Sequence, residues 1–414
     1  MKDLLKHIIF DQQERENSAM VEREIDRRLI DSPEILVISG VRRCGKSVLL
    51  QQIRTSQKEN DYYMNFDDDR LVNFKVEDFQ TLYETFIELF GEQKTFYFDE
   101  IQNITGWERF VRRLYDNGCK VFVTGSNANM LSRELGTHLT GRYCQIELYP
   151  FSFKEFLKLK GVCPQNKDLY TTVGKGEIKK LFDEFLTTGG FPRYIQSHNN
   201  NYLSTLYENI IYKDVITRNK LTNERELLEM VYYMASNASK RFSYNSLAKT
   251  IGIKHTETIK NYLEYLEDTY LLFQLTKFDW SVRKQMASPK KVYFVDNAII
   301  KRVGFNATAN IGQLLENAVF VELKRRHQEV YYYDSGIECD FISREDGQII
   351  FACQVTRSLN EEKTRKREIN GLLSALKAYN LPEGTILTED ETEELIVEDK
   401  RIYIRPIWRW LLSE

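Results

Sequence analysis

The clearest chemistry in this sequence lies in an eight-residue stretch that satisfies the pattern G-x-x-x-x-G-K-[ST], Gly40-Val41-Arg42-Arg43-Cys44-Gly45-Lys46-Ser47. In such a loop the glycines let backbone N–H groups turn toward a phosphate, the lysine bridges the β- and γ-phosphates, and the final hydroxyl is a ligand of Mg²⁺. An apolar run at 34–39 precedes the loop, and an apolar helix-forming run follows it from Val48. The pattern predicts a site for ATP and Mg²⁺ at residues 40–48; an ordinary glycine turn with an exposed lysine is the alternative.

Two adjacent carboxylates stand at the end of a second apolar run, Thr95-Phe96-Tyr97-Phe98-Asp99-Glu100. We expect Asp99 to hold Mg²⁺ through water. Glu100 is expected to act as general base or to orient the attacking water, because that role needs a carboxylate that the metal does not occupy. The alternative is that the two acids only begin a helix, where negative charge is favourable.

A third apolar run, 120–123, ends in small polar residues, Thr124-Gly125-Ser126-Asn127. One of Thr124, Ser126 and Asn127 is expected to hydrogen-bond the γ-phosphate or the attacking water. Ser and Asn are also preferred at helix caps, so a cap is the competing interpretation.

The elements that must position these groups alternate between short apolar runs and helical stretches. This alternation predicts an α/β fold with a parallel sheet, whose ligands lie at the carboxyl ends of the strands. We place this core in residues 1–150, beginning with a polar helix at residues 1–28 that includes VEREIDRRL, and a helical lid at 151–218, which GGFP interrupts at 189–192. The order of helices and strands at 219–304 favours a winged helix-turn-helix, and residues 305–414 predict a smaller α/β unit.

The composition of the 414 residues is that of a folded globular protein, with 42% hydrophobic, 13% aromatic and 29% charged residues. Six scattered cysteines form no CxxC pair and no cluster with histidine, which favours reduced thiols over disulfides or a zinc site. The N-terminal segment lacks the apolar core of a signal peptide, and no apolar run of about 18 residues follows. We therefore expect a cytoplasmic protein that does not cross a membrane.

Basic residues concentrate in one segment, although the net charge of the chain is only −3. Residues 240–302 contain twelve basic and six acidic side chains. Residues 281–291 would form the wing, where Lys and Arg meet phosphates. The expected recognition helix begins with residues able to contact DNA, namely Lys254, His255, Thr256, Thr258 and Lys260. The segment predicts DNA as a partner; a winged helix used for protein contacts or oligomerisation is the alternative.

Several stretches carry a resemblance to a known family: GVRRCGKSVLL, FDEIQNITGWERFVRRLYDNG, VFVTGSNANMLSRELGTHLTGR with LYPFSFKEFL, GGFPRYI and YKDVITRN. They resemble the prokaryotic AAA+-type P-loop ATPases whose core is joined to a winged helix and a restriction-endonuclease-like, or Holliday-junction-resolvase-like, C-terminal domain. In this family an arginine near the end of the core reaches the γ-phosphate, usually from a neighbouring subunit, and Arg142 matches it. A lid arginine acts as sensor, and Arg193 lies in the matching region. The resemblance implies a homo-oligomer; a surface ion pair is the alternative for Arg142.

The C-terminal unit resembles the PD-(D/E)XK nuclease fold, in which a helix glutamate, a strand aspartate and an E-x-K on the next strand assemble metal and water. Glu316 and Asp340 match the first two elements, whereas the third reads Gln354-Val355-Thr356. An amide and a hydroxyl supply neither the anionic ligand nor the cation that hydrolysis needs. We expect a domain without nuclease activity, used for binding or assembly, unless a residue such as Glu322 or Lys324 replaces the missing groups.

Together these features predict a Mg²⁺-dependent ATPase of the AAA+ class that binds DNA and couples ATP binding and hydrolysis to domain motion or assembly. Ser47 and Asp99 are the expected metal ligands. The expected catalytic residues are Lys46, Glu100, Ser126, Asn127, Arg142 and Arg193. Two alternatives stay open: a nucleotide-gated binding switch with little turnover that acts on a protein partner, and an active ATP-dependent nuclease.

Overall fold

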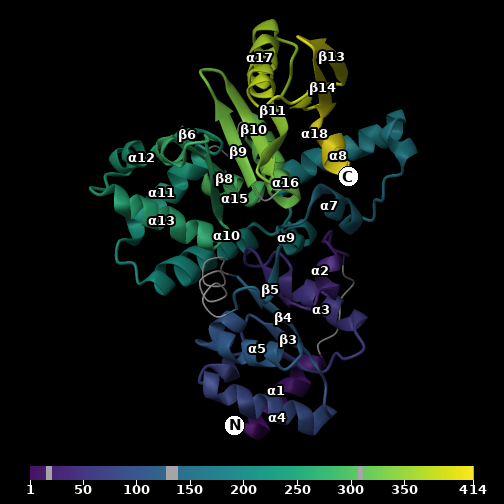
Figure 1. The fold of residues 1–414 in the computed structure, drawn as a ribbon, viewed down its shortest axis with the longest axis vertical. Helices are drawn as coiled ribbons and strands as arrows, with labels where there is room; N and C mark the ends of the chain where they lie inside the picture. Colours follow the sequence, from purple (N-terminus) through teal and green to yellow (C-terminus); the bar gives the residue numbers. More distant parts are fainter. Residues whose placement is uncertain (15–20, 127–138, 306–310, 328, 414) are drawn as a thin grey trace. The chain divides into compact units, whose positions relative to one another are not determined.

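The computed structural model describes residues 1–14, 21–126, 139–305, 311–327 and 329–413 (Figure 1). The chain forms two compact units. The first consists of residues 1–148 with 268–270, and the second of residues 149–267 with 271–414.

The first unit is built on a five-stranded parallel sheet in the order β2-β3-β4-β1-β5. Its strands are β1 (Ile35–Ser39), β2 (Tyr63–Asn65), β3 (Thr95–Asp99), β4 (Lys120–Gly125) and β5 (Tyr143–Glu147). All five residues of β1 are buried, as expected for a strand inside a parallel sheet that is covered on both faces. The register places Ser39 beside Gly125 and Asn65 beside Asp99, so the loops after β1 to β4 leave from one edge of the sheet. The predicted α/β fold with a parallel sheet is confirmed for this unit.

Helices and short 3-10 turns connect and cover these strands: α1 (Lys2–Gln13), α2 (Arg28–Asp31), α3 (Lys46–Ser56), η1 (Asp69–Leu71), η2 (Val76–Asp78), α4 (Phe79–Phe90), η3 (Ile101–Asn103) and α5 (Trp107–Asp116). Their apolar sides and the sheet share one core, in which the rings of Phe79 and Phe110 stack with centroids 4.6 Å apart. Helix α1 packs against α4 (Figure 1), because Leu5, Ile8 and Ile9 are fully buried on one of its faces.

The N-terminal helix is shorter than the sequence predicts. Helix α1 ends at Gln13, residues 21–26 are not helical, and the single turn α2 begins only at Arg28. A side-chain oxygen of Asp26 accepts the backbone N–H of Arg28 at 3.0 Å, which favours a helix start after Asp26 over a helix that runs through it. The expectation of a helix through VEREIDRRL was therefore wrong.

The second unit starts with helical segments: α7 (Phe153–Leu159), η4 (Asn166–Leu169), α8 (Thr172–Thr188), α9 (Pro192–Ser197), α10 (Asn200–Glu208) and the π-helix η5 (Asn209–Thr217). The GGFP sequence separates α8 from α9. A Cβ atom on Gly189 would lie 1.8 Å from Oδ1 of Asp296, and one on Gly190 would lie 2.3 Å from the carbonyl oxygen of Phe151. The two glycines are needed because other parts of the same unit pack directly on their backbone.

A small three-stranded antiparallel sheet follows, in the order β6-β8-β7. Its strands are β6 (Arg241–Phe242), β7 (Leu272–Thr276) and β8 (Lys290–Phe294), and the helices of this part are α11 (Glu224–Ser236), α12 (Tyr244–Ile251) and α13 (Thr256–Asp268). A short helix, α14 (Val282–Ala287), occupies the stretch between β7 and β8, where the sequence predicts a wing. None of the residues of α14 is buried.

The C-terminal part is a six-stranded mixed sheet in the order β13-β14-β12-β11-β10-β9. Strands β9 (Glu329–Asp334), β10 (Glu338–Glu345) and β11 (Gln348–Val355) are antiparallel to one another, β12 (Glu383–Thr388) and β14 (Lys400–Pro406) run parallel to β11, and β13 (Glu393–Val397) is an edge strand. The helices are α15 (Asn297–Val303), α16 (Ile311–Arg326), α17 (Glu362–Ala378) and α18 (Ile407–Leu412). Helix α17 packs on β10, β11 and β12 (Figure 1).

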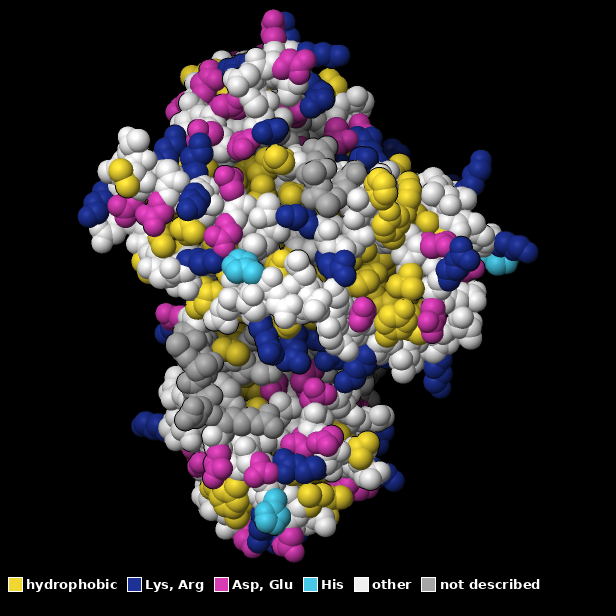
Figure 2. All heavy atoms as spheres, turned by 180° about the vertical axis from the view of Figure 1, so that it is seen from behind, with side chains coloured by type: hydrophobic (Ala, Val, Ile, Leu, Met, Phe, Trp, Pro, Cys, Tyr) yellow, Lys and Arg dark blue, Asp and Glu magenta, His cyan; other side chains and the backbone are white. Residues whose placement is uncertain are grey.

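The surface carries charges of both signs. On the face that Figure 2 shows, Lys and Arg side chains are interspersed with Asp and Glu side chains over most of the area, in keeping with the net charge of −3. None of the helices in the described part of the chain combines the length and the apolar character that crossing a bilayer requires.

Candidate active site

The loop that follows β1 has the backbone of an anion-binding nest. Gly40, Arg43 and Gly45 have φ angles of 150°, 67° and 106°. A Cβ atom on Gly40 would lie 2.1 Å from the carbonyl oxygen of Leu148, so only glycine fits there. Because left-handed residues recur at this spacing, the backbone of the loop is curved. The loop leads directly into α3, and the N-terminus of a helix favours negative charge.

The residues predicted to bind nucleotide lie together along this loop and the first turn of α3. Val41, Cys44 and Lys46 are buried, Arg42, Gly45 and Ser47 are half-buried, and Arg43 and Val48 are exposed. Burial raises the pKa of the Cys44 thiol, in agreement with a structural and unreactive cysteine.

Lys46 is buried, and its ammonium lies against the phosphate loop. Its ammonium donates hydrogen bonds to the carbonyl oxygens of Gly40 at 3.1 Å and Val41 at 3.2 Å. A carboxylate oxygen of Glu100 lies 3.7 Å away. Since its closest partners are neutral carbonyl groups, the positive charge of Lys46 is directed into the loop in which a phosphate would bind.

Ser47 and Asp99 form a pair of oxygen donors at the start of α3 and the end of β3. The Ser47 hydroxyl donates to Oδ1 of Asp99 at 3.0 Å. The other carboxylate oxygen, Oδ2, accepts from Asn65 Nδ2 at 3.1 Å and from the Tyr63 hydroxyl at 3.3 Å, which fixes its orientation. A hydroxyl next to an oriented carboxylate fits Mg²⁺, which prefers oxygen ligands and takes few of them from the protein.

Asp99 and Glu100 differ in their ionisation although they are neighbours. Burial and the charge of Glu100 raise the pKa of Asp99 against the hydrogen bonds from Thr124 and Ser47. Burial also acts to raise the pKa of Glu100, but the charge of Lys46 and a hydrogen bond from Gln102 reverse this effect and leave the pKa below its ordinary value. Glu100 is thus ionised at neutral pH, as a base must be.

Glu100 is held in an unusual backbone conformation beside the end of β4. Its φ is 52°, and its N–H donates to the Thr124 hydroxyl at 2.9 Å. The same hydroxyl donates to Oδ1 of Asp99. Gln102 Nε2 donates to Glu100 Oε2 at 2.6 Å and lies 3.5 Å from the hydroxyl of Ser126. The structure therefore brings Thr124 and Ser126 to the two acids, while Asn127 lies outside the described residues.

Sequence reasoning missed one residue of this region, Arg23. Its guanidinium is buried and donates to the carbonyl oxygen of Cys44 at 2.7 Å, and a Cβ atom on Gly45 would lie 3.1 Å from it. A segment that is not helical delivers this cation to the phosphate loop from upstream of β1. The only signal in the sequence was an arginine in a run of alternating charges, which usually indicates a solvated surface.

Arg142, the arginine expected at the γ-phosphate, is not part of this cluster. Arg142 precedes β5 beside Ile35, the first residue of β1, so it lies at the edge of the sheet opposite the phosphate loop. Its Nε pairs with Asp116 at 3.2 Å. Arg193 belongs to the second unit, where its guanidinium lies 5.7 Å from the ring centre of Tyr202. The roles of Arg142 and Arg193 stay predictions.

Glu316 and Asp340 of the C-terminal part do come together, whereas Glu322 pairs with Arg325 and Arg326 instead. Glu316 on α16 and Asp340 on β10 both contact the ammonium of Lys291, at 3.0 and 3.1 Å. Gln354, at the position of the missing carboxylate, turns its amide to the backbone of β10. Burial and the nearby Asp340 raise the pKa of Glu316 even though Lys291 opposes the shift. Sequence reasoning missed Lys291 as a member of this cluster, because it comes from the three-stranded sheet.

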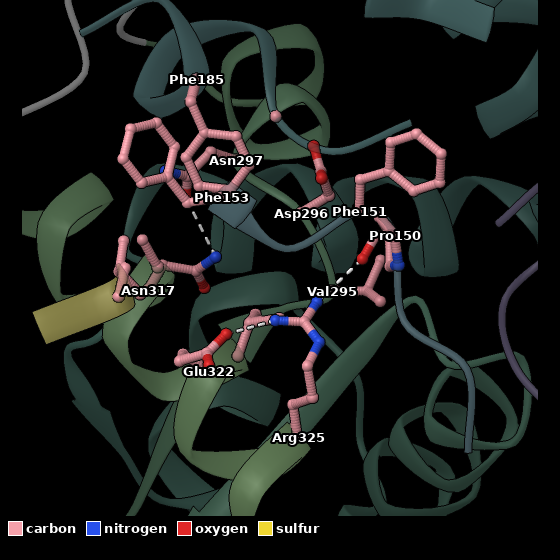
Figure 3. A pocket seen from close by; sticks show the side chains of 14 residues that line it. Pro150, Phe151, Phe153, Phe185, Val295, Asp296, Asn297, Asn317, Glu322 and Arg325 are labelled. Carbon is pink, nitrogen blue, oxygen red and sulfur yellow. Dashed lines mark hydrogen bonds and ion pairs between the residues drawn. The ribbon is translucent and has the colours of Figure 1, made fainter. Parts of the chain in front are cut away.

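A small cavity of about 30 Å³ lies within the second unit, where α8, α15 and α16 meet (Figure 3). Asp296 accepts the N–H groups of Gly190 at 2.6 Å and Ala298 at 2.8 Å. Burial raises the pKa of Asp296 to about 7. Arg325 donates to the carbonyl oxygen of Pro150 at 2.8 Å and pairs with Glu322 (Figure 3). The volume suits a water molecule and no larger ligand, so the cavity is structural.

Two known families match parts of the sequence. Residues 32–157 match a family described as an AAA domain. Residues 179–309 match a domain of unknown function. The AAA match covers the phosphate loop, Asp99, Glu100 and Arg142.

Relatives and solved structures extend the comparison. The chain is 33% identical over 356 residues to an uncharacterized protein of Haemophilus influenzae, covering 81% of this chain and 86% of the relative. Among solved structures, Cdc6p of Pyrobaculum aerophilum aligns with 69% of this chain and 96% of its own at 13% identity, but its TM-score of 0.27 carries no argument. The chain is also 33% identical to the uncharacterized protein MJ1544 of Methanocaldococcus jannaschii, covering 100% of this chain and 96% of the relative. The protein therefore belongs to the family of MJ1544, and its residues 32–157 are similar to an AAA domain.

Proposed function

We propose that this protein is a Mg²⁺-dependent ATPase of the AAA+ class. The observation that carries the proposal is the convergence of four side chains at the carboxyl edge of the parallel sheet. Ser47 lies 3.0 Å from Asp99, and Lys46 lies 3.7 Å from Glu100. A lysine, a pair of metal ligands and a separate ionised carboxylate are the groups that transfer of a phosphoryl group to water requires.

The residues have distinct tasks in this proposal. Lys46 and the N–H groups of the loop bind the β- and γ-phosphates. Mg²⁺ held by Ser47 and Asp99 would neutralise charge on the phosphate oxygens. Glu100 orients the attacking water and accepts its proton, while the water oxygen bonds to the γ-phosphorus and the bond to the ADP oxygen breaks. Thr124 is a positioning residue, because its hydroxyl contacts both the Asp99 carboxylate and the Glu100 backbone.

Phosphate release from ATP by the purified full chain tests the proposal. Wild-type protein with Mg²⁺ is expected to release phosphate, Glu100→Gln to bind ATP without releasing it, and Lys46→Ala to do neither. A wild-type protein that binds no adenine or guanine nucleotide in Mg²⁺ buffer would end the proposal.

A nucleotide-gated switch with little turnover is the second candidate. It is favoured by the contacts of Glu100, whose carboxylate is already bonded to Gln102 at 2.6 Å. An attacking water has to share or replace this contact before Glu100 can act as a base. Wild-type protein that binds ATP but releases no phosphate, with or without DNA, would identify the switch.

We further propose that residues 219–304 are a winged helix that binds DNA. The order helix, strand, helix, helix, strand, short helix, strand and the β6-β8-β7 sheet support this proposal. Lys254, Arg283 and Lys284 are exposed and available to phosphates. Lys290 and Lys291, which the sequence placed in the wing, are buried and bonded to carbonyl and carboxylate groups instead. They are therefore withdrawn as phosphate contacts.

Binding of a fluorescent DNA duplex at several salt concentrations tests whether residues 219–304 bind DNA. Replacing both Lys254 and Lys284 by alanine is expected to weaken binding and to make its dependence on salt less steep. The matched control is Lys366→Ala, an exposed lysine of α17 that pairs with Glu362. An equal loss in both proteins would contradict a DNA site at residues 219–304.

A further inference from the structure

A buried lysine forms the centre of an ionic cluster in the second unit. Strand β8 carries Lys291, whose side chain is only 4% exposed. Its ammonium lies 3.0 Å from Oε1 of Glu316, 2.5 Å from Oε1 of Glu338 and 3.1 Å from Oδ1 of Asp340. One cation thus meets three carboxylates from two other elements.

The surrounding contacts fix this arrangement from several sides. Glu338 and Asp340 are two residues apart on β10 and so share a face of the sheet. Tyr293, two residues after Lys291, donates its hydroxyl to Glu316 at 2.6 Å. The second carboxylate oxygen of Asp340 accepts the N–H of Val355 at 3.0 Å. The other carboxylate oxygen of Glu338 pairs with Arg241, so each of the three acids has a further contact that fixes its orientation.

The cluster opens onto a groove of about 780 Å³, so water and ions can reach it. The groove is lined by residues of β6, β8, β10, α16 and α17, by the segment before β6, and by the end of β11 with the segment after it. Gln354 does not join the ionic groups, because its amide accepts the N–H of Asp340 at 2.6 Å and donates to the carbonyl oxygen of Glu338 at 3.1 Å.

Three converging carboxylates are a ligand set that divalent cations use, and burying them without a cation costs several kcal/mol. Here the three carboxylate oxygens lie at hydrogen-bond distance from the Lys291 nitrogen. With the acids in this arrangement, the described residues contain no group of acids, histidines or cysteines that could hold a metal ion. We propose that the Lys291 ammonium takes the place of a divalent cation in this groove and keeps it free of metal. Lys291 then acts as an internal cation that blocks metal-dependent chemistry at Glu316 and Asp340.

This inference is independent of the proposed ATPase, because it concerns other residues and is tested by metal binding in the absence of nucleotide. The test is Mn²⁺ binding to the full-length protein without nucleotide, followed through the electron paramagnetic resonance signal of free Mn²⁺. Lys291→Met keeps the length of the side chain and removes its charge. Because Ser47 and Asp99 also offer oxygen ligands, each protein is compared with its Asp340→Asn counterpart.

The expected result is an Asp340-dependent Mn²⁺ site in Lys291→Met, at least about tenfold tighter than any in wild type. Wild type is expected to show no Asp340-dependent binding. The control is Lys290→Met, since Lys290 is buried on the same strand but donates only to carbonyl oxygens of Gln285, Met286 and Ser288. It should gain no site.

Two outcomes would overturn the inference. Asp340-dependent Mn²⁺ binding by wild-type protein would show that the ammonium does not block the groove, and this result does not depend on the folding of any Lys291 variant. A folded Lys291→Met that gains no site would show that the carboxylates are not placed to receive a cation. If Lys291→Met fails to fold, Lys291→Gln replaces it and is judged by the same criterion.

Discussion

The two units each bury a lysine beside carboxylates, but they use it differently. Lys46 is bonded to two backbone carbonyl oxygens and lies 3.7 Å from one carboxylate, Glu100. Lys291 lies within 3.1 Å of three carboxylates. The first lysine keeps a positive charge for a phosphate, whereas the charge of the second is already used by its own chain. The partners of a buried lysine, not its burial, decide whether it can bind a ligand.

The acids of the two regions show the same contrast. The pKa of Glu100 lies below its ordinary value, since Lys46 and Gln102 outweigh the effect of burial. The pKa of Glu316 is raised, because burial and Asp340 outweigh Lys291. Glu100 is thus prepared for the role of a base, and Glu316 is held as part of a structural ion cluster.

The largest effect on ligand binding is expected from Lys46→Ala. Removing its charged contacts to two phosphates should weaken ATP binding by about 100-fold or more. Fluorescence titration with a labelled ATP analogue measures this. Lys291→Met serves as the paired variant and should leave ATP affinity unchanged; a similar loss in both proteins would contradict the division of roles.

The next effect concerns stability and should be seen in Lys291→Met. Lys291 is buried and pairs with Glu316 and Asp340, whose side chains are 15% exposed, so removing its charge should lower the free energy of unfolding by up to about 3–5 kcal/mol in metal-free buffer. Urea unfolding followed by circular dichroism measures the change. A loss below about 1 kcal/mol would mean that the ion cluster is far better hydrated than its burial indicates.

A third buried acid, Asp296, lacks a lysine and should respond to pH. Its folded-state pKa of about 7 lies above the ordinary value of 3.8. The folded chain therefore binds this proton more tightly than the unfolded chain, so the stabilisation is complete below about pH 4 and is lost as the pH rises through 7. The loss amounts to at most about 4 kcal/mol. Urea unfolding at several pH values compares wild type with Asp296→Asn (Figure 3); parallel profiles would contradict the shift.

The smallest effect on stability is expected from Arg142→Ala. Its side chain is 31% exposed and pairs with a half-exposed Asp116, and such ion pairs contribute less than about 1 kcal/mol. If Arg142 reaches the γ-phosphate of a neighbouring subunit, the variant loses phosphate release while mixing it with Lys46→Ala protein restores part of it. Release that is unchanged in the variant, or independent of dilution, would leave Arg142 as a surface ion pair.

The first unit could be predicted from the sequence to a large extent. Its strands are short apolar runs that end in the residues of the site, and the phosphate loop has a backbone that demands glycine at Gly40. Arg23 could not be predicted in the same way, because it reaches the loop through a segment without a periodic pattern. A single arginine in a charged run carries no information about the group that it contacts.

The second unit was harder to predict from the sequence, because the Lys291 ion cluster depends on contacts between elements that are distant in the chain. Lys291 lies in the predicted wing, 25 residues before Glu316 and 49 before Asp340. Its sequence neighbours indicate a solvated basic segment, and only the tertiary packing of β8 against α16 and β10 reveals the ion cluster. GGFP also depends on distant contacts, since Asp296 and Phe151 lie directly against the two glycines.

Phosphate release is the most direct test of the central claim that Lys46, Ser47, Asp99 and Glu100 form an ATP-hydrolysing site. Wild-type protein and Glu100→Gln are compared at saturating ATP and Mg²⁺, with bound nucleotide measured in the same samples. The account predicts steady phosphate release by wild type, and ATP that stays bound and intact in the variant. Equal release by the two proteins, or no nucleotide bound to either, would contradict it.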